Sequence, residues 1–354
     1  MYLTKKGGPK KWPADVEKIR SNFTINEFLT TSNQKIKKGE ALGFGRSLIL
    51  HHVPAKMLGR FITPAGPEKI ATRAYIPELA ALADKFNLRT AAARHNGCKW
   101  SSKGCRSGCL AWSGHGGISA KVQAARGRRT LAMISNPTAY ARALVYAVGW
   151  HYRRASEAGL KLSLRLRGTD EGPPIGWQNL KIHFNFEELS QLKRIYNLEI
   201  SPPPSDGLNL AQLLKPAGVV LYDYSKAPLS DIKHQRASGW HITASFKADT
   251  LTASRDGLRA LCEGFPLAIP VDLAKGQPIP SAVYIQTKNG ETVEVPAVDG
   301  DLSDYRPATP DGVAVILRTK KSRGADPLLF SKFTLRGHSL PQQLLDGFIQ
   351  LKWN

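Results

Sequence analysis

The stretch LSLRLR at residues 162–167 begins a series of short strand-like segments, and this series decides the predicted fold. Five similar segments follow it along the chain, at residues 219–224, 241–246, 267–272, 292–298 and 313–318. Segments with helical spacing lie between several of them, at residues 186–195, 209–214 and 255–263. Strands that alternate with helices are typical of a parallel sheet, so the sequence predicts an α/β fold.

The segments before this series extend the pattern toward the N-terminus. The spacing of apolar residues predicts helices at residues 76–87, 119–134 and 138–158. Asn136 is expected to cap the third of these helices, with Pro137 at its first position. The run LRTAAA at residues 88–93 is interpreted as a further strand. Six or seven strands are enough for a TIM-like parallel barrel, and the scarcity of helices late in the chain favours an incomplete one.

Residues 1–65 are predicted to form a polar, basic N-terminal extension, and residues 66–354 the barrel-like domain. The extension contains two groups of lysines, which are Lys5, Lys6, Lys10 and Lys11, and Lys35, Lys37 and Lys38. Its first residues lack the apolar core of a secretory signal. The chain has no run of about 18 apolar residues, so we expect no membrane partner and a cytoplasmic location.

Positive charge is concentrated in the first half of the chain. The formal net charge is +22, from 50 Lys and Arg against 28 Asp and Glu. Residues 1–160 hold 27 basic and 8 acidic residues, whereas residues 161–354 hold 23 and 20. Such an asymmetry predicts a polyanion, here nucleic acid, as the partner of the first half. The predicted contacts are Lys99, Lys103, Arg106, Arg126, Arg128 and Arg129, with the helical arginines, including Arg142, Arg153 and Arg154, on exposed faces.

Three of the four cysteines lie close together in the segment HNGCKWSSKGCRSGC at residues 95–109. Cys98, Cys105 and Cys109 have the spacing C-x6-C-x3-C, and the Gly and Ser residues between them allow the thiols to converge on one centre. Thiolates are soft ligands, which favour zinc or an iron–sulfur cluster. The cations that would lower the thiol pKa values and offset the charge of a cluster are Lys99, Lys103 and Arg106.

Three interpretations of this loop, residues 95–115, stay open. A four-iron cluster would use the three cysteines and leave one iron open to a cofactor or substrate. A zinc ion needs a fourth ligand, for which His95 and His115 are the candidates. The paired C-x2-C knuckles of a zinc ribbon are missing from the sequence, so the 4Fe-4S cluster is favoured over zinc and over thiols without a metal.

The place of the loop in the predicted fold indicates a catalytic role. It follows directly after the predicted strand at residues 88–93, and the catalytic loops of parallel barrels lie at the carboxyl ends of strands. The arrangement is similar to that of radical S-adenosylmethionine enzymes, which carry a three-cysteine loop after the first barrel strand. Their spacing is C-x3-C-x2-C, which this chain does not share, and no glycine-rich cofactor motif follows its second strand. The similarity implies S-adenosylmethionine as a cofactor.

Several motifs spread over residues 90–320 resemble one family of phage and plasmid proteins. The loop, CKWSSKGCRSGCLAWSGHG, is followed by VQAARGRRT and by SNPTAYARAL. Later segments read LRLRGTDE, LYDYSKAP, HITASF, VDGDLSDYRP and VAVILRTK. Together they resemble the gene product 88-like family. The resemblance implies a phage, prophage or plasmid origin, and hence the cytoplasm of a host cell, but it implies no settled activity.

Charged groups that follow the predicted strands are the candidate catalytic residues. Parallel strands bring their carboxyl ends to one edge of a sheet, where polar side chains can form a site. The candidates are Asp170, Asp223, Lys226, Asp301, Asp304 and Arg306. The adjacent residues His51 and His52 are interpreted as structural, because neighbours on a strand point to opposite faces.

These observations give two hypotheses for function. In the first, the chain is an iron–sulfur protein that acts on nucleic acid, as a radical-type enzyme that modifies a nucleic acid or a nucleotide. In the alternative, it is a non-enzymatic DNA- or RNA-binding accessory protein of replication or transcription, with a structural zinc or iron–sulfur site. Loss of the metal abolishes turnover in the first case and weakens binding in the second.

Overall fold

The computed structural model describes residues 12–25, 27–31, 33–54, 57–63, 75–107, 109, 119–170, 172–173, 176–198, 205–246, 251–273, 276–286, 291–319, 335–336 and 349–352. The chain divides into two compact units. Unit 1 comprises residues 1–33, 45–99 and 119–221, and unit 2 comprises residues 34–44, 100–118 and 222–354. Each unit is described by itself.

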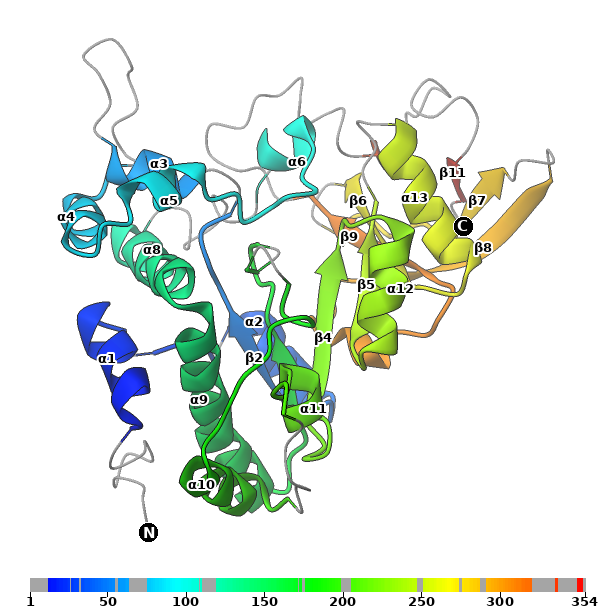
Figure 1. Ribbon diagram of the computed structural model, residues 1–354. Coiled ribbons are helices and arrows are strands. Elements are labelled where there is room, and N and C mark those ends of the chain that lie inside the picture. The colour runs from blue at the N-terminus through cyan, green and yellow to red at the C-terminus, as the bar shows by residue number, and fades with distance from the viewer. Residues whose placement is uncertain are drawn as a thin grey trace. The chain divides into compact units, whose positions relative to one another are not determined.

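Unit 1 contains the first strands of a mainly parallel sheet, which Figure 1 shows. The short strand β1 (Leu29–Thr30) pairs antiparallel with β2 (Arg46–Leu50), and β2 pairs parallel with β3 (Leu162–Arg165). The first two residues of β4 (Val220–Ser225) pair parallel with β3. Ser47 and Ser163 stand opposite each other in β2 and β3, and their buried hydroxyl groups are 2.9 Å apart. Both faces of these strands are largely buried, as is usual for parallel sheets.

Two long helices connect β2 to β3. Helix α8 (Ala120–Ser135) begins after Ser119, whose hydroxyl accepts a hydrogen bond from the Val122 amide. Helix α9 (Pro137–Glu157) begins after Asn136, whose side chain accepts from the Ala139 amide, and it packs against β3. The other helices of unit 1 are α1 (Ala14–Asn22), α3 (Met57–Ile62), α4 (Pro77–Lys85), α5 (Arg89–Arg94), α10 (Phe186–Tyr196) and α11 (Leu210–Leu214).

Unit 2 continues with the strands that follow. The last four residues of β4 pair parallel with β5 (His241–Ser245), and the parallel order goes on through β6 (Leu267–Asp272), β9 (Ala314–Arg318) and β8 (Thr292–Asp299). The antiparallel strands β7 (Ala282–Gln286) and β11 (Ile349–Lys352) follow β8, and β10 (Leu335–Arg336) pairs with β6. The helices of this unit are α2 (Gln34–Ala41), α6 (Lys103–Ser107), α12 (Leu229–Ala237), α13 (Leu251–Cys262) and the 3-10 helix η3 (Arg306–Ala308).

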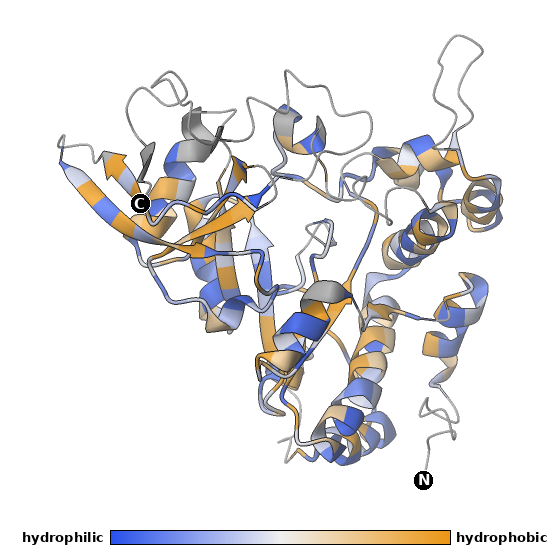
Figure 2. Cartoon of the chain, turned by 180° about the vertical axis from the view of Figure 1, so that it is seen from behind, coloured by the Kyte–Doolittle hydropathy of each residue, from blue (hydrophilic) through white to orange (hydrophobic). Residues whose placement is uncertain are grey.

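Apolar side chains hold the strands of unit 2 together. The side chains of Ala268, Val313 and Val315 form a buried cluster, against which Tyr224, Val298 and Leu317 pack. Residues paired across parallel strands project to the same face, and Val315 stands opposite both Ala268 and Val298. Helix α13 packs on β5 and β6. Strand β8 instead alternates hydrophobic and hydrophilic residues along its length (Figure 2), as a strand does that is half exposed.

The predicted α/β class and the mainly parallel sheet are confirmed. Each of the six strands in the predicted series has its counterpart, which are β3, β4, β5, β6, β8 and β9. The predicted caps of α9 are also correct, with Asn136 as N-cap and Pro137 first in the helix. The predicted extension at residues 1–65 includes β2, so part of it belongs to the sheet.

The strand predicted at residues 88–93 is wrong, because these residues form helix α5 (Arg89–Arg94). Alanine has the highest helix propensity and is depleted in strands, and three alanines lie in this run. The strand that precedes the cysteine loop in the sheet is β2 instead, and helices α3 to α5 lie between the two.

The barrel predicted from the sequence is not seen as a closed sheet. The strand order runs from β1 to β11, and no pairing of described residues joins these two ends. The sheet is therefore open over the strands that the structure describes. Among the same residues, no helix combines the length and the hydropathy that a membrane span needs.

Candidate functional site

The candidate site lies in unit 1, where β2 and β3 end side by side. The Gly168 amide donates a hydrogen bond of 2.9 Å to the Leu50 carbonyl, which extends the pairing of β2 and β3 past their last residues. A Cβ atom on Gly168 would lie 2.4 Å from His51 Nδ1 and 2.5 Å from the Leu50 carbonyl oxygen. Only glycine therefore allows the two strand ends to approach this closely.

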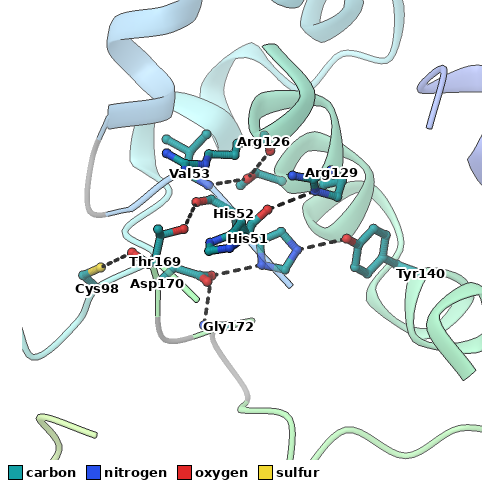
Figure 3. Close-up of polar contacts among 11 residues, drawn as sticks. His51, His52, Val53, Cys98, Arg126, Arg129, Tyr140, Thr169, Asp170 and Gly172 are labelled. Carbon is teal, nitrogen blue, oxygen red and sulfur yellow. Dashed lines mark hydrogen bonds and ion pairs between the residues drawn. The ribbon is translucent and has the colours of Figure 1, made fainter. Parts of the chain in front are cut away.

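A buried chain of three polar side chains crosses this end of the sheet (Figure 3). Asp170 Oδ2 lies 3.2 Å from His52 Nδ1, and both side chains are fully buried. His52 Nε2 lies 3.0 Å from the hydroxyl of Tyr140 on α9. Burial raises the pKa of Tyr140 far above its ordinary value, so its hydroxyl stays protonated and donates to His52. The imidazole therefore links the carboxylate to the phenol.

The rest of Asp170 is oriented by the backbone that follows it. Its Oδ2 atom also accepts a hydrogen bond of 3.0 Å from the Gly172 amide. Gly172 has a φ of +82°, and a Cβ atom there would lie 2.3 Å from Trp177 Nε1. This turn thus needs glycine. Its Gly172 amide binds Oδ2 of Asp170 and makes no hydrogen bond to Oδ1.

Two buried polar atoms beside this chain have no hydrogen-bond partner among the described residues. They are Asp170 Oδ1 and His95 Nε2. Both residues flank Gly97, because a Cβ atom on Gly97 would lie 3.3 Å from His95 Nε2 and 3.3 Å from Asp170 Cβ. Burial lowers the pKa of His95 and outweighs the nearby Asp170 carboxylate, so the imidazole is neutral at pH 7. A neutral imidazole and a carboxylate are suited to bind a ligand or exchange a proton with it.

The first cysteine of the loop adjoins these residues. The Cys98 thiol donates a weak hydrogen bond of 3.7 Å to the Thr169 carbonyl, and the Thr169 hydroxyl donates to the His52 carbonyl at 2.6 Å. A Cβ atom on Gly97 would lie 2.8 Å from the Val53 carbonyl oxygen. Cys98 therefore lies beside the segments that follow β2 and β3. The predicted position of the loop, directly after a strand at residues 88–93, is wrong, because those residues form helix α5.

None of the four cysteines forms a disulfide, and their exposure separates them into two kinds. Cys98, Cys105 and Cys109 are half-buried, whereas Cys262 at the end of α13 is exposed. Among the residues that the structure describes, no group of three or more His, Cys, Asp or Glu side chains is placed to hold a metal ion. His115, the second candidate for a zinc ligand, lies outside these residues.

The arginines of α8 are less exposed than the sequence suggests. Arg126 is buried, with 7% of its surface exposed, and Arg128 and Arg129 are half-buried. Arg129 Nε donates to the His51 carbonyl at 3.0 Å, and its Nη1 donates to the Glu27 carbonyl at 3.1 Å. The prediction of exposed faces for the helical arginines is therefore wrong for these residues, because α8 packs on the segment after β2.

The remaining helical arginines differ in the same way. Arg142 is half-buried and forms ion pairs with Asp15 and Glu188. Arg153 and Arg154 near the end of α9 are exposed, as predicted. The three predicted nucleic-acid contacts in the cysteine loop are also exposed, which are Lys99, Lys103 and Arg106.

The other candidate catalytic residues lie in unit 2 and have mainly structural contacts. Asp301 Oδ2 accepts from the Arg318 amide at 2.9 Å, and the Arg318 side chain pairs with Asp299. Arg306 is buried and donates to the carbonyls of Gly300 and Ser303. These contacts hold the connection from β8 to β9 together.

Three further candidates in unit 2 are placed as follows. Asp223 is fully buried within β4 rather than at its end, and Lys226 just after β4 is half-buried. Asp304 is half-buried in the same connection as Asp301.

From the sequence, His95 is predicted only as a zinc ligand and His52 only as a structural residue, whereas Tyr140 and Trp177 are missed. The pair of histidines directly after the buried strand β2 was the available signal for His52. The two histidines do have different surroundings, since His52 contacts Tyr140 while His51 adjoins Gly168.

A comparison with models of protein families, with curated proteins and with solved structures finds no match to this chain.

Proposed function

We propose that this chain is an iron–sulfur enzyme that acts on nucleic acid or nucleotides, with Cys98, Cys105 and Cys109 as the ligands of a 4Fe-4S cluster. One observation carries the proposal. Cys98, the first cysteine of the loop, donates to the carbonyl of Thr169, in the segment that follows β3, beside a buried carboxylate–imidazole pair. In parallel α/β proteins this end of the sheet carries the catalytic groups.

The order of the strands supports the incomplete barrel that the proposal assumes. The parallel strands β2, β3, β4, β5 and β6 are neighbours in the order in which they occur in the chain, with β9 next to β6. Such successive neighbours are typical of a barrel. Beyond β9 the order runs back through β8 to β7, so the likeness to a barrel is limited to the strands from β2 to β6. The family resemblance in the motifs and the similarity to radical S-adenosylmethionine enzymes are part of the same proposal.

The donor set fits an iron–sulfur cluster chemically. Three cysteines without disulfides lie on one short segment, and each is half-buried rather than enclosed in a core. Thiolate ligands need such access for cluster assembly, and a three-cysteine set leaves one iron open. When bound, a reduced cluster supplies one electron for the reductive cleavage of S-adenosylmethionine.

The residues of the chain have separate roles in this proposal. His52 is fully buried and cannot reach a substrate, so it orients Asp170 through the 3.2 Å contact. The side chain of Asp170 and His95 Nε2 both adjoin Gly97, and Asp170 Oδ1 and His95 Nε2 bind the ligand or exchange a proton with it. The exposed cations Lys99, Lys103 and Arg106 attract the nucleic-acid backbone.

The metal is tested by anaerobic purification, iron and sulfide analysis and visible absorption. Wild-type protein is expected to hold several irons per chain and to show an iron–thiolate absorption band. Cys98→Ser, Cys105→Ser and Cys109→Ser should each lose this band. The control is Cys262→Ser, which removes an exposed thiol outside the loop and should retain the iron. A colourless protein with one zinc per chain, or iron that survives in the loop variants, contradicts the proposal.

A second candidate function is a binding protein with a structural metal. It is favoured by the three exposed cations of the cysteine loop, since surface cations suffice for backbone binding. Cleavage of S-adenosylmethionine by reduced protein separates the two. Turnover that depends on Asp170 supports the enzyme, whereas zinc content and nucleic-acid binding lost with the cysteines support the binding protein.

A further inference from the structure

A cavity in unit 2 lies at the amino ends of the parallel strands. His241, the first residue of β5, and Pro266, directly before β6, both line it. The Ala244 amide donates to the Pro266 carbonyl at 2.8 Å, and the Leu267 amide donates to the Val313 carbonyl at 2.9 Å, so β5, β6 and β9 begin side by side. The cavity has a volume of about 290 Å³, which includes open space at its mouth. The polar residues that line it are Arg236, His241, Thr243, Arg306, Thr309 and Asp311.

The wall of this cavity contains a buried positive charge. Arg306 is only 5% exposed, and its Nη2 atom donates to the carbonyls of Gly300 and Ser303. Its Nε atom is also buried and has no hydrogen-bond partner among the described residues. No carboxylate in the described part of the chain forms an ion pair with Arg306. A buried charge is costly unless a counter-charge pairs with it, so this side chain favours an anion in the cavity.

The backbone around Arg306 holds it in place. The Thr309 amide donates to the Arg306 carbonyl at 2.8 Å, and the 3-10 helix η3, which begins at Arg306, packs on β5. The Nη2 side of the guanidinium group is thus bound by backbone carbonyls, whereas Nε remains for a ligand.

The other charged pair at the cavity is neutral as a whole. Arg236 lies near the end of α12, which packs on β5 (Figure 1), and it pairs with Asp311 at 2.5 Å. The guanidinium carbon of Arg236 lies 4.8 Å from the centre of the Phe265 ring. Because Arg236 and Asp311 balance each other, the net charge of these two residues and Arg306 is positive.

We infer that this cavity binds a phosphate group, with Arg306 and Arg236 as charged donors and Thr243 and Thr309 as hydroxyl donors. A guanidinium group presents a planar fork of donors that matches phosphate oxygens, and such charge-assisted pairs are strong. The oxygens of a phosphate group accept hydrogen bonds from several directions, whereas the two oxygens of a carboxylate lie in one plane. Pockets for drug-sized ligands have volumes of about 300–1,000 Å³, so the smaller cavity suits the phosphate group itself rather than a whole nucleotide.

The inference goes beyond the proposed function. The cavity is lined by none of the four cysteines, and it lies at the amino ends of strands, whereas the proposed chemistry uses carboxyl ends. Binding therefore requires no metal. The phosphate has two sources, which are free phosphate and the monophosphate of a nucleotide whose remainder extends from the mouth of the cavity.

Binding is measured by calorimetry on the full chain, with inorganic phosphate as the probe, at constant ionic strength. The wild type is expected to bind phosphate saturably. Arg306→Gln should weaken this binding about tenfold or more, because it removes a buried charge-assisted contact.

Two substitutions in the exposed ion pair separate binding from structure. Arg236→Gln and Asp311→Asn break the same contact, so a purely structural effect has the same direction in both. In a phosphate site, the loss of a positive charge in Arg236→Gln should weaken binding about threefold, and the loss of a negative charge in Asp311→Asn should strengthen it about threefold. The matched control is Arg259→Gln, which removes an exposed arginine of α13 that does not line the cavity and should leave the affinity unchanged.

These variants decide the inference even where Arg306→Gln fails to fold. It is overturned by a wild type that does not bind phosphate, by changes of the same direction in Arg236→Gln and Asp311→Asn, or by equal losses in Arg236→Gln and Arg259→Gln.

A competition experiment identifies the source of the phosphate. A nucleoside 5′-monophosphate that displaces inorganic phosphate and binds more tightly identifies a nucleotide, and one that binds no more tightly identifies free phosphate. Phosphate binding with these dependences in a protein that holds no iron keeps the inference and overturns the proposed function.

Discussion

At the scale of single residues, the buried contact between Tyr140 and His52 can be separated from the packing of the tyrosine ring. Tyr140→Phe keeps the ring but leaves His52 Nε2 without its 3.0 Å partner. An unsatisfied buried polar group costs about 1–3 kcal/mol, so the free energy of unfolding should fall by about this amount. Urea denaturation followed by circular dichroism measures the difference.

The same helix supplies a matched control. Tyr146 is also buried in α9, but its hydroxyl has no hydrogen-bond partner among the described residues. Tyr146→Phe should therefore be neutral or slightly stabilising, because it removes a buried group that gains nothing from its surroundings. Equal destabilisation by both substitutions would show that the contact with His52 contributes nothing.

A residue of the site can be predicted from the sequence only when a local pattern of neighbouring residues marks it. Cys98 and Asp170 stand out in the sequence, because clustered thiols and a carboxylate after a strand are local patterns. His52 and Tyr140 do not, since their contact forms only when distant segments pack. Tyr140 is 88 residues from His52 along the chain.

At the scale of secondary-structure elements, helix α9 contains a histidine that makes stability depend on pH. Burial, followed by the charges of Arg154 and Arg46, lowers the pKa of His151 from 6.5 to about 4. Below about pH 6.5, the imidazole of His151 is therefore protonated in the unfolded chain but stays neutral in the folded chain. The free energy of unfolding is therefore not reduced by His151 above pH 6.5, and it falls as the pH decreases toward about 4.

His151→Gln should reduce this acid sensitivity. The free energy of unfolding of the wild type, minus that of the variant, is expected to decrease between about pH 6.5 and about pH 4 and to be constant above that range. Urea midpoints at a series of pH values test it. A difference that does not change with pH contradicts the depressed pKa of His151.

Element boundaries also show where local signals are reliable. The Asn–Pro pair at residues 136–137 predicts the start of α9 correctly, because capping depends only on neighbouring residues. Strand β2 has no such signal, and its Leu48 and Leu50 are recognisable as core only in the folded chain. The run of alanines in α5 is a short apolar segment that resembles a strand, but the propensity of its alanines is helical.

At the scale of the whole molecule, the excess of basic residues predicts binding to a nucleic-acid backbone. Lys99 and Lys103 are exposed. The double variant Lys99→Gln/Lys103→Gln should bind an oligonucleotide more weakly, and similarly so for different base sequences. Two lost phosphate contacts should reduce the slope of log affinity against log salt concentration by about 1.8 for a duplex or about 1.4 for a single strand. Fluorescence anisotropy over a range of salt concentrations measures this slope.

A control of equal charge is available in Lys181→Gln/Lys233→Gln. Lys181 pairs with Asp206 and Lys233 pairs with Glu263, and both lysines lie outside the cysteine loop. This variant should retain nearly the wild-type slope. Equal changes in both double variants would assign the effect to net charge rather than to the cysteine loop.

The sequence by itself determined the α/β class, most strand positions, the N-terminal cap of α9 and the clustered thiols. These features depend on residue type and local periodicity, which act over a few neighbouring residues. Only the tertiary structure decided that β2 precedes the cysteine loop in the sheet, that Arg126 is buried, and that Asp170 meets His52. Each of these contacts joins segments that are far apart in the chain. Hydrophobic burial packs such segments together, and because it is non-directional, the sequence does not specify which segments will meet.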